Sequence, residues 1–310
     1  MIDWPSGSRD GYVSSHNTQS AVPNAYAAVA LSRMSAMAGW LGNTADQEQW
    51  ANTSSTIVAT MKSKLYNSSS GNVKDGVGVN HYSIHASMFA AVAGIADGDA
   101  AMADKIAAYI VSRGATEACS CMGAYWMLEA LYRLAVDSAA AADAALDVLT
   151  SDRKNSWLHM IEQGATTTME AWTPDEKPNL TWSHPWCSSP NNVMIRLLLG
   201  LQPMERRWAR ISLMPQPASL QTVHVIAATS VGPIEVLVEQ QLSSPQTISA
   251  TLDVPSGSTA HVCLPPAHSS AASAATTLKL DGAVVNSVAK GRLLCLATDA
   301  SSGKHTVLRE

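Results

Sequence analysis

Residues 24–65 read NAYAAVALSRMSAMAGWLGNTADQEQWANTSSTIVATMKSKL. Mostly apolar side chains recur in this stretch every three or four residues, the spacing that places them on one face of an α-helix. The first repeat consists of Tyr26, Ala30, Met34, Met37 and Leu41, and the second of Trp50, Ser54, Ile57, Met61 and Leu65. Since Gly and Asn separate the two repeats, the stretch predicts one antiparallel helix hairpin.

Further short, Ala-rich stretches with helical spacing follow this hairpin. They are separated by Gly, Asn, Asp or Ser, and lie at about 85–95, 100–113, 120–135, 139–149, 153–163 and 189–200. Three long loops, at about 1–23, 66–84 and 164–188, collect His, Trp and acidic residues. Long loops inside a compact domain are uncommon unless they are functional, so the chemistry is expected there.

The periodicity changes after about residue 205, where apolar and polar residues begin to alternate. Alternation predicts strands, at about 223–226, 234–238, 248–252, 260–264, 277–280, 293–296 and 305–308 after a first strand near Trp208. The Ser/Ala-rich tract 269–276 is expected to be a loop. We therefore expect a helical domain over 1–203 and an antiparallel β-sandwich over 204–310.

Composition excludes several functional classes. The chain has 46% apolar residues, enough for a sizeable core, and 20 basic against 25 acidic residues with no basic run that would bind nucleic acid. No apolar stretch is long enough to span a membrane, and no nucleotide-binding or acyl-transfer motif occurs. We expect no cofactor and no metal, and we interpret the five scattered cysteines as buried free thiols.

The loop Gly164–Trp172 is the most informative for function. It places Glu170 beside threonines and Trp172, where hydrogen bonds can hold a carboxylate that takes a proton from bound water. The alternative is a helix-capping or salt-bridged surface residue. Proline, polar and aromatic residues also alternate in 179–190, which suits either the wall of a sugar-binding cleft or a loop anchored by buried indoles.

Two histidines four residues apart, His81 and His85, resemble a metal pair but have no third ligand nearby. Hydrogen bonding to a polar ligand or to the backbone is the interpretation that we favour. Carboxylates combined with aromatic rings fit a carbohydrate ligand better than a nucleotide.

An ordered set of motifs resembles the α-L-rhamnosidases of glycoside hydrolase family 78. The motifs are Asp3-Trp4-Pro5, Ser8-Arg9-Asp10-Gly11-Tyr12-Val13, His85-Ala86-Ser87, Tyr125-Trp126-Met127-Leu128-Glu129-Ala130-Leu131-Tyr132, Thr168-Met169-Glu170-Ala171-Trp172, Lys177-Pro178-Asn179 and His184-Pro185-Trp186. The resemblance implies a six-hairpin (α/α)6 toroid followed by a β-sandwich, and hydrolysis of terminal α-L-rhamnosides with inversion at the anomeric carbon. It also implies a rhamnose-containing glycoside as the partner.

By this resemblance Glu170 is the general base. The residues that would bind the sugar are Asp3, Trp4, Asp10, His85, Trp126, Trp172, Trp182 and His184. The family's general acid belongs to an acidic motif well before the Asp-Trp-Pro loop, and residues 1–23 do not reproduce it. We therefore expect an incomplete toroid that lacks its acid, with uncovered apolar helix faces that make the chain poorly soluble or inactive alone. Asp10 is a weak substitute for that acid.

Two other functions stay open. The chain is either an inactive carbohydrate-binding remnant, in which the aromatic loops still hold sugar, or a six-hairpin glycosidase for another sugar. Sugar binding without hydrolysis would favour the first alternative, and turnover on a panel of aryl glycosides would identify the second.

Overall fold

The structure is a computed structural model that describes residues 2–14, 19–177, 179–268 and 277–310 of the chain. It divides into two compact units, Met1–Pro190 and Asn191–Glu310, called here the helical unit and the sheet unit. The domain boundary expected at 203/204 stays a prediction. The expected loop at 269–276 lies outside the described residues, as does Pro178 of the Lys-Pro-Asn motif.

All of the expected helical stretches form helices. They are α1 (Ala21–Trp40), α2 (Thr44–Leu65), α3 (Ile84–Ala93), α4 (Ala100–Ser112), α5 (Cys121–Leu134), α6 (Ala139–Leu149), α7 (Trp157–Glu162) and α8 (Ser189–Val193), the last continuing as a π-helical turn, η5 (Met194–Leu198). A 3-10 turn, η1 (Ser6–Arg9), precedes α1, and three more lie between later helices: η2 (Ala115–Ala118), η3 (Pro174–Glu176) and η4 (Pro185–Cys187). A hairpin of two strands with two residues each, β1 (Tyr66–Asn67) and β2 (Asn72–Val73), follows α2.

Side-chain caps set where several of these helices begin. The residue before α3, α5, α6 and α7 is a serine whose oxygen accepts a hydrogen bond from the backbone N–H three residues later. Asp99 does the same for α4. These caps satisfy N–H groups that have no partner within the helix. One of them, Ser120, also helps to build the candidate site.

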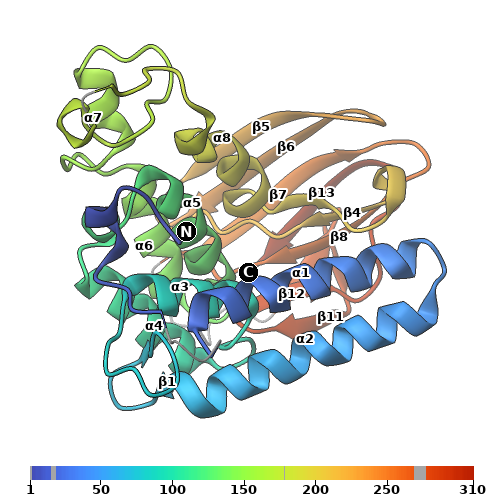
Figure 1. Ribbon diagram of the computed structural model, residues 1–310. Helices are drawn as coiled ribbons and strands as arrows, with labels where there is room; N and C mark the ends of the chain where they lie inside the picture. The colour runs from blue at the N-terminus through green and yellow to red at the C-terminus, as the bar shows by residue number, and fades with distance from the viewer. Residues whose placement is uncertain (1, 15–18, 178, 269–276) are drawn as a thin grey trace. The chain divides into compact units, whose positions relative to one another are not determined.

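The first helix hairpin has the expected helices but not the expected buried face. Figure 1 shows α1 and α2 side by side as a long pair, and the buried side of α1 consists mainly of small residues such as Ala25, Ala28 and Ala38. The larger apolar side chains of the repeat point outward, with Met37 49% exposed and Leu41 81% exposed. The spacing therefore predicted the helix correctly, while close helix packing selected the alanine face.

The sheet unit contains two sheets. A six-stranded sheet has the order β10-β9-β13-β7-β6-β5, and a five-stranded sheet has the order β11-β12-β8-β4-β3. The strands are β3 (Leu201–Pro203), β4 (Arg210–Leu213), β5 (Thr222–Thr229), β6 (Gly232–Gln241), β7 (Thr247–Val254), β8 (Thr259–Leu264), β9 (Leu278–Leu280), β10 (Ala283–Val285), β11 (Ser287–Lys290), β12 (Leu293–Leu296) and β13 (Gly303–Arg309).

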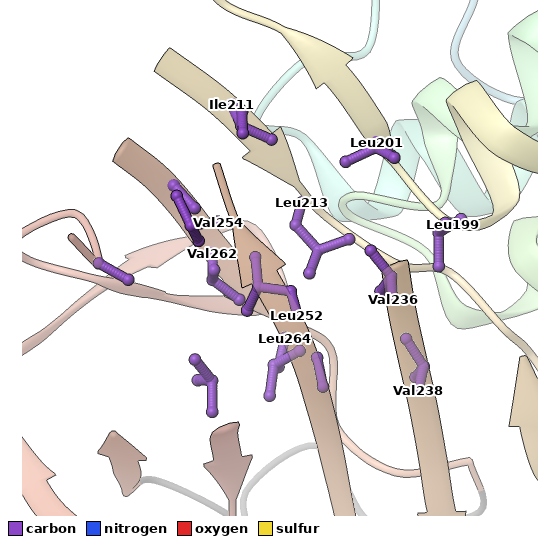
Figure 2. Close-up of a cluster of buried hydrophobic side chains, with 14 of the residues drawn as sticks. Leu199, Leu201, Ile211, Leu213, Val236, Val238, Leu252, Val254, Val262 and Leu264 are labelled. Atoms are coloured by element: carbon purple, nitrogen blue, oxygen red, sulfur yellow. The ribbon is translucent and has the colours of Figure 1, made fainter. Parts of the chain in front are cut away.

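One apolar core fills the space between the two sheets. Figure 2 shows Ile211, Leu213, Val262 and Leu264 of the five-stranded sheet together with Val236, Val238 and Leu252 of the other sheet. Every second residue of these strands faces this core, which explains the alternation in the sequence. The expected sandwich is therefore confirmed, with β3, β10 and β11 as short strands that alternation did not predict.

Strand direction differs from the expectation at one pair. The sandwich was expected to be antiparallel, but β4 and β8 run parallel, with Ile211 opposite Ala260. The three strands between them, β5, β6 and β7, belong to the other sheet, so the chain re-enters the first sheet in its original direction. Among the described helices, none is long and apolar enough to cross a membrane.

Candidate active site

Glu170 lies in the long loop between α7 and α8 with its carboxylate held on both oxygens. Lys177 Nζ donates to Oε1 at 2.5 Å, and the backbone N–H of Thr181 donates to Oε2 at 3.1 Å. The residue is only 8% exposed. The carboxylate is thus sheltered and has a defined orientation, as a residue that must activate one particular water molecule requires.

The two arms of this loop are joined by hydrogen bonds on either side of Glu170. The backbone N–H of Glu170 donates to Thr181 O at 2.9 Å, and that of His184 donates to Thr168 O at 2.8 Å. Two threonine hydroxyls add bonds, from Thr167 to Trp182 O at 2.9 Å and from Thr168 to His184 O at 2.8 Å. The Thr-rich sequence before Glu170 therefore acts by binding the second arm, which carries Thr181, Trp182 and His184.

The charge around Glu170 favours its ionised form. The hydrogen bond from the Lys177 ammonium group, followed by the N–H of Thr181, lowers the pKa of Glu170 from its ordinary value. Hydrogen bonds and a positive charge stabilise a carboxylate relative to the neutral acid. Glu170 is therefore a proton acceptor at neutral pH and not a proton donor.

Aromatic and imidazole rings lie close to the ion pair formed by Glu170 and Lys177. The ammonium group of Lys177 lies 5.3 Å from the centroid of the Trp4 ring, close enough for a cation–π contact. Trp4 meets Trp186 edge to face with centroids 6.2 Å apart, and Trp186 meets His184 at 4.6 Å. The fold thus links Glu170, through Lys177, to Trp4 and His184 of the predicted set.

The group formed by Glu170, Lys177, Trp4, Trp186 and His184 contains two residues that were not predicted as site residues. Lys177 and Trp186 both occur in the motifs that carry the family resemblance, Lys-Pro-Asn and His-Pro-Trp. Neither was singled out, because a lysine and a tryptophan in a polar loop are ordinary when only the sequence is known. Their significance lies in the contacts with Glu170 and Trp4.

The loop is fastened to the helices by a disulfide and by indole N–H groups. Cys121, at the start of α5, is joined to Cys187 in η4, with Cα atoms 5.0 Å apart. The buried Trp172 donates from Nε1 to Cys119 O at 2.8 Å, and Trp157 donates to Cys187 O at 2.7 Å. Trp172 therefore supports the loop from inside the protein.

The interpretation of all five cysteines as free thiols was wrong. Two disulfides are present, Cys121–Cys187 and Cys263–Cys295, and Cys119 alone is a buried thiol in the described part of the chain. The partners are 66 and 32 residues apart in sequence. Such pairs meet only through the fold, so spacing along the chain does not reveal them.

Asp3 and His85 lie in the interior of the helical unit. Both side chains are fully buried, and Asp3 Oδ2 accepts from His85 Nε2 at 2.8 Å and from the backbone N–H of Ser120 at 3.0 Å. Asp3 Oδ1 accepts from the backbone N–H of Trp4 at 2.8 Å and from the Ser120 hydroxyl. Asp3 thereby connects the Trp4 backbone to the first turn of α5.

The remaining predicted residues lie in other surroundings. Asp10 pairs with Arg113 and accepts from the backbone N–H of Ile84 at 2.6 Å, where α3 begins. Trp126 belongs to an aromatic cluster with Tyr26, Phe89 and Tyr125. Trp182 sits on the second arm of the loop with an exposed side chain. Their roles as sugar contacts stay predictions.

Glu176 differs from Glu170 in its electrostatics. Burial, as the largest cause, raises the pKa of Glu176, so this group keeps its proton to a higher pH than an ordinary glutamate does. Its Oε2 atom is buried and has no hydrogen-bond partner among the described residues. We assign no catalytic role to Glu176, which lies outside the motifs that resemble the family.

Comparison with known proteins identifies both parts of the chain. Residues 1–198 match the bacterial alpha-L-rhamnosidase 6 hairpin glycosidase domain, and residues 200–279 match the bacterial alpha-L-rhamnosidase C-terminal domain. No curated protein sequence matches the chain.

Similar solved structures include three α-L-rhamnosidases. That from Dictyoglumus thermophilum has 17% identity and a TM-score of 0.69 over 92% of this chain and 31% of its own. That from Streptomyces avermitilis, solved with L-rhamnose, has 19% identity and a TM-score of 0.63 over 100% of this chain and 29% of its own. That from Aspergillus terreus has 16% identity and a TM-score of 0.65 over 92% of this chain and 30% of its own.

At these identities the structural similarity concerns the fold, and the chain spans about a third of the length of these proteins. The family model for the helical domain, however, covers more than half of the chain, from residue 1 to residue 198. The ordered motifs around Glu170 lie within that match. The chain therefore belongs to the bacterial α-L-rhamnosidase family.

Proposed function

We propose that this chain carries the part of an inverting α-L-rhamnosidase active site that activates water. Glu170 is the general base, and the substrate is a glycoside or polysaccharide with a terminal α-L-rhamnose. The observation that carries the proposal is the carboxylate of Glu170, which is buried and held on both oxygens, and which Lys177 links to Trp4.

In this reaction the oxygen of a water molecule forms a bond to the anomeric carbon of the rhamnose. Glu170 takes one proton from that water while the bond from the anomeric carbon to the glycosidic oxygen breaks. The departing oxygen must receive a proton from an acid on the opposite side of the sugar, about 6.5–9.5 Å from the base in inverting enzymes. We propose that this acid does not belong to the 310 residues of the chain.

Lys177 acts through Glu170. Its ammonium group keeps the carboxylate ionised and fixes Oε1, while the Thr181 N–H fixes Oε2. The remaining lone pairs of the two oxygens can accept the hydrogen bond of the attacking water. The cost is a weaker base, because the same contacts that fix the carboxylate also lower its pKa.

The rings beside Glu170 suit a deoxysugar. An indole such as Trp4 offers a flat apolar face to the methyl side of rhamnose, and His184 offers ring nitrogens to its hydroxyl groups. We further propose that Asp3, His85 and Trp172 act as positioning residues from the interior, since all three are buried.

A substrate that needs no acid provides the most direct test. In α-L-rhamnosyl fluoride the leaving group departs as fluoride without protonation, so the base alone limits hydrolysis. We expect the 310-residue chain to hydrolyse this fluoride with β-L-rhamnose as the first product by NMR, and to leave alkyl α-L-rhamnosides intact. Glu170→Gln should lower the rate by about 10²-fold or more.

Glu162→Gln is the matched control, because Glu162 has an exposed side chain in α7 and should keep the full rate. First release of α-L-rhamnose, or an undiminished rate for Glu170→Gln, would disprove the assigned base. Binding of L-rhamnose without hydrolysis of the fluoride would instead identify a carbohydrate-binding remnant. A preference for another glycosyl fluoride would identify a different sugar.

A further inference from the structure

The outer face of the five-stranded sheet carries a row of polar and sulfur side chains. Ala260, Val262 and Leu264 of β8 point into the core (Figure 2 labels the last two), so His261 and Cys263 point to the opposite face. Cys295 of β12 is the register partner of Cys263 and lies on this same outer face. Three groups with metal-binding atoms therefore share one face of two neighbouring strands.

Cys263 and Cys295 are joined as a disulfide in the structure, so only after reduction can both sulfurs and the His261 imidazole bind one ion. One ring nitrogen of His261 and the sulfurs of Cys263 and Cys295 all lie within 4.8 Å of one another. The distance from His261 Nε2 to Cys263 Sγ is 3.4 Å. In a tetrahedral zinc site with bonds of about 2.0–2.3 Å, a nitrogen and a sulfur ligand are separated by about 3.6 Å. The spacing thus nearly matches that of two zinc ligands.

A carboxylate orients the imidazole for this role. Asp299 Oδ1 lies 3.1 Å from His261 Nδ1, which leaves Nε2 directed at the sulfur. Arg210 of β4 holds Asp299 with two hydrogen bonds, at 2.5 and 3.1 Å. Histidines that bind metals usually donate their second N–H to a carboxylate in this manner. A disulfide that serves only to crosslink two strands needs no such arrangement beside it.

Ser212 of β4 lies beside the imidazole on the sheet, because it is the register partner of His261 on this parallel strand. Its neighbours Ile211 and Leu213 face the core, so Ser212 shares the outer face with His261. Ser212 is buried, and its hydroxyl has no hydrogen-bond partner among the described residues. A buried polar group without a partner is uncommon and suggests that a ligand or water binds nearby.

We propose that His261, Cys263 and Cys295 bind one Zn²⁺ ion when the two cysteines are reduced, with a water molecule as the fourth ligand. Two thiolates and an imidazole form a donor set that zinc prefers over hard cations such as Mg²⁺. Among the three ligands, His261 is the partly exposed one, whereas Cys263 and Cys295 are buried. The site belongs to the sheet unit and is independent of the reaction proposed for Glu170.

Zinc binding and the disulfide exclude each other. Two molecules of a thiol reductant supply two electrons and two protons and become a disulfide, while Cys263 and Cys295 become thiols. Zn²⁺ then displaces both thiol protons and binds the thiolates. The state of this cysteine pair therefore determines whether the site can hold metal.

The test is metal binding by the 310-residue chain before and after reduction. The protein is reduced with dithiothreitol under anaerobic conditions, desalted, and titrated with Zn²⁺ against a chromophoric chelator and separately with Co²⁺. We expect one tightly bound Zn²⁺ per reduced chain and none in the oxidised chain. Co²⁺ should give the thiolate-to-metal charge-transfer band and the intense visible absorption of a four-coordinate site.

Substitutions separate this site from the other cysteines. Cys263→Ser/Cys295→Ser should abolish tight binding, whereas Cys119→Ser/Cys121→Ser/Cys187→Ser should retain it. The reductant opens the Cys121–Cys187 bond in any case, so the control variant loses little beyond what reduction already removes. Asp299→Asn should weaken binding by about 10- to 100-fold and keep the cobalt spectrum.

Tight binding that survives Cys263→Ser/Cys295→Ser, a cobalt spectrum without a thiolate band, or no tight binding by the reduced chain would each overturn the proposal. If Cys263→Ser/Cys295→Ser does not fold, His261→Gln tests the site instead. Circular dichroism establishes that the His261→Gln protein is folded, and full zinc affinity in that protein would exclude the imidazole as a ligand.

Discussion

The ammonium group of Lys177 binds Glu170 Oε1 at 2.5 Å and at the same time lies 5.3 Å from the ring centroid of Trp4. One side chain thus connects the candidate base to the aromatic wall of the candidate site. Its charge acts on the carboxylate and its position fixes where the carboxylate points. The properties of Glu170 therefore depend on Lys177 in ways that experiments can measure.

Replacing Lys177 by methionine should raise the pKa of Glu170 toward its ordinary value, because the strongest cause of the lowered pKa is removed. The acid limb of the pH profile of rhamnosyl fluoride hydrolysis should then move to higher pH.

A group with a lowered pKa in the folded state stabilises the protein above its unfolded pKa, and this contribution is lost as the pH falls through the folded value. The stability that Lys177 adds should therefore be present at neutral pH and disappear in acid.

An NMR titration of ¹³C-labelled glutamate measures this pKa directly and requires no turnover. Lys304→Met serves as the control, since Lys304 is exposed in the sheet unit. An unchanged Glu170 titration in Lys177→Met would show that the ammonium group does not set its pKa.

Asp3→Asn should destabilise the helical unit. Asp3 is fully buried and accepts hydrogen bonds from His85, Ser120 and the Trp4 backbone. An amide cannot accept on both sides, so at least one buried donor loses its partner, at a cost of about 1–3 kcal/mol. Urea denaturation of the variant should show this loss. Asp104→Asn, on the exposed side of α4, should change the free energy of unfolding by less than about 0.5 kcal/mol.

The outward apolar side chains of α1 should make the chain associate. Met34, Met37 and Trp40 of α1 and Leu41, the residue that caps its C-terminus, are all exposed. Contiguous exposed apolar surface favours association. Met37→Gln/Leu41→Gln should reduce concentration-dependent association in analytical ultracentrifugation and leave the thermal transition nearly unchanged. Val284→Gln, an exposed residue of β10, should have no such effect.

Leu252→Ala should destabilise the sheet unit by about 2–5 kcal/mol, because it removes a buried side chain from the core between the sheets. The comparison is Ile226→Ala in β5, where the side chain is exposed and the loss should be small. Chemical denaturation monitored by the far-UV circular dichroism of the strands distinguishes the two. Equal losses for both variants would contradict the assignment of Leu252 to the core.

Much of the fold was predictable because its determinants are local. The helical spacing and the alternation after residue 205 predicted every helix from α1 to α8 and the long strands β5 to β8, since side-chain periodicity follows backbone geometry. The short strands β3, β10 and β11 escaped prediction, although β4, β9 and β12 are similarly short and were predicted, because three or four residues establish a period only weakly.

Part of the candidate site was predictable in the same way. The ordered motifs identified the loop with Glu170 and His184, and residues 1–198 match the corresponding family model. The motifs did not reveal that Asp3 and His85 lie inside the protein. Burial depends on what the rest of the chain places around a residue, and these two residues are 82 positions apart.

The sequence alone determined the helical and strand segments, the family and the loop that carries Glu170, because each of these depends on neighbouring residues or on an ordered motif. Only the tertiary structure decided which face of α1 is buried, that β4 and β8 run parallel, which cysteines pair, and that Lys177 holds Glu170. These features arise from contacts between segments distant in sequence or on opposite arms of a loop. Their energies depend on distances that no periodicity along the chain encodes.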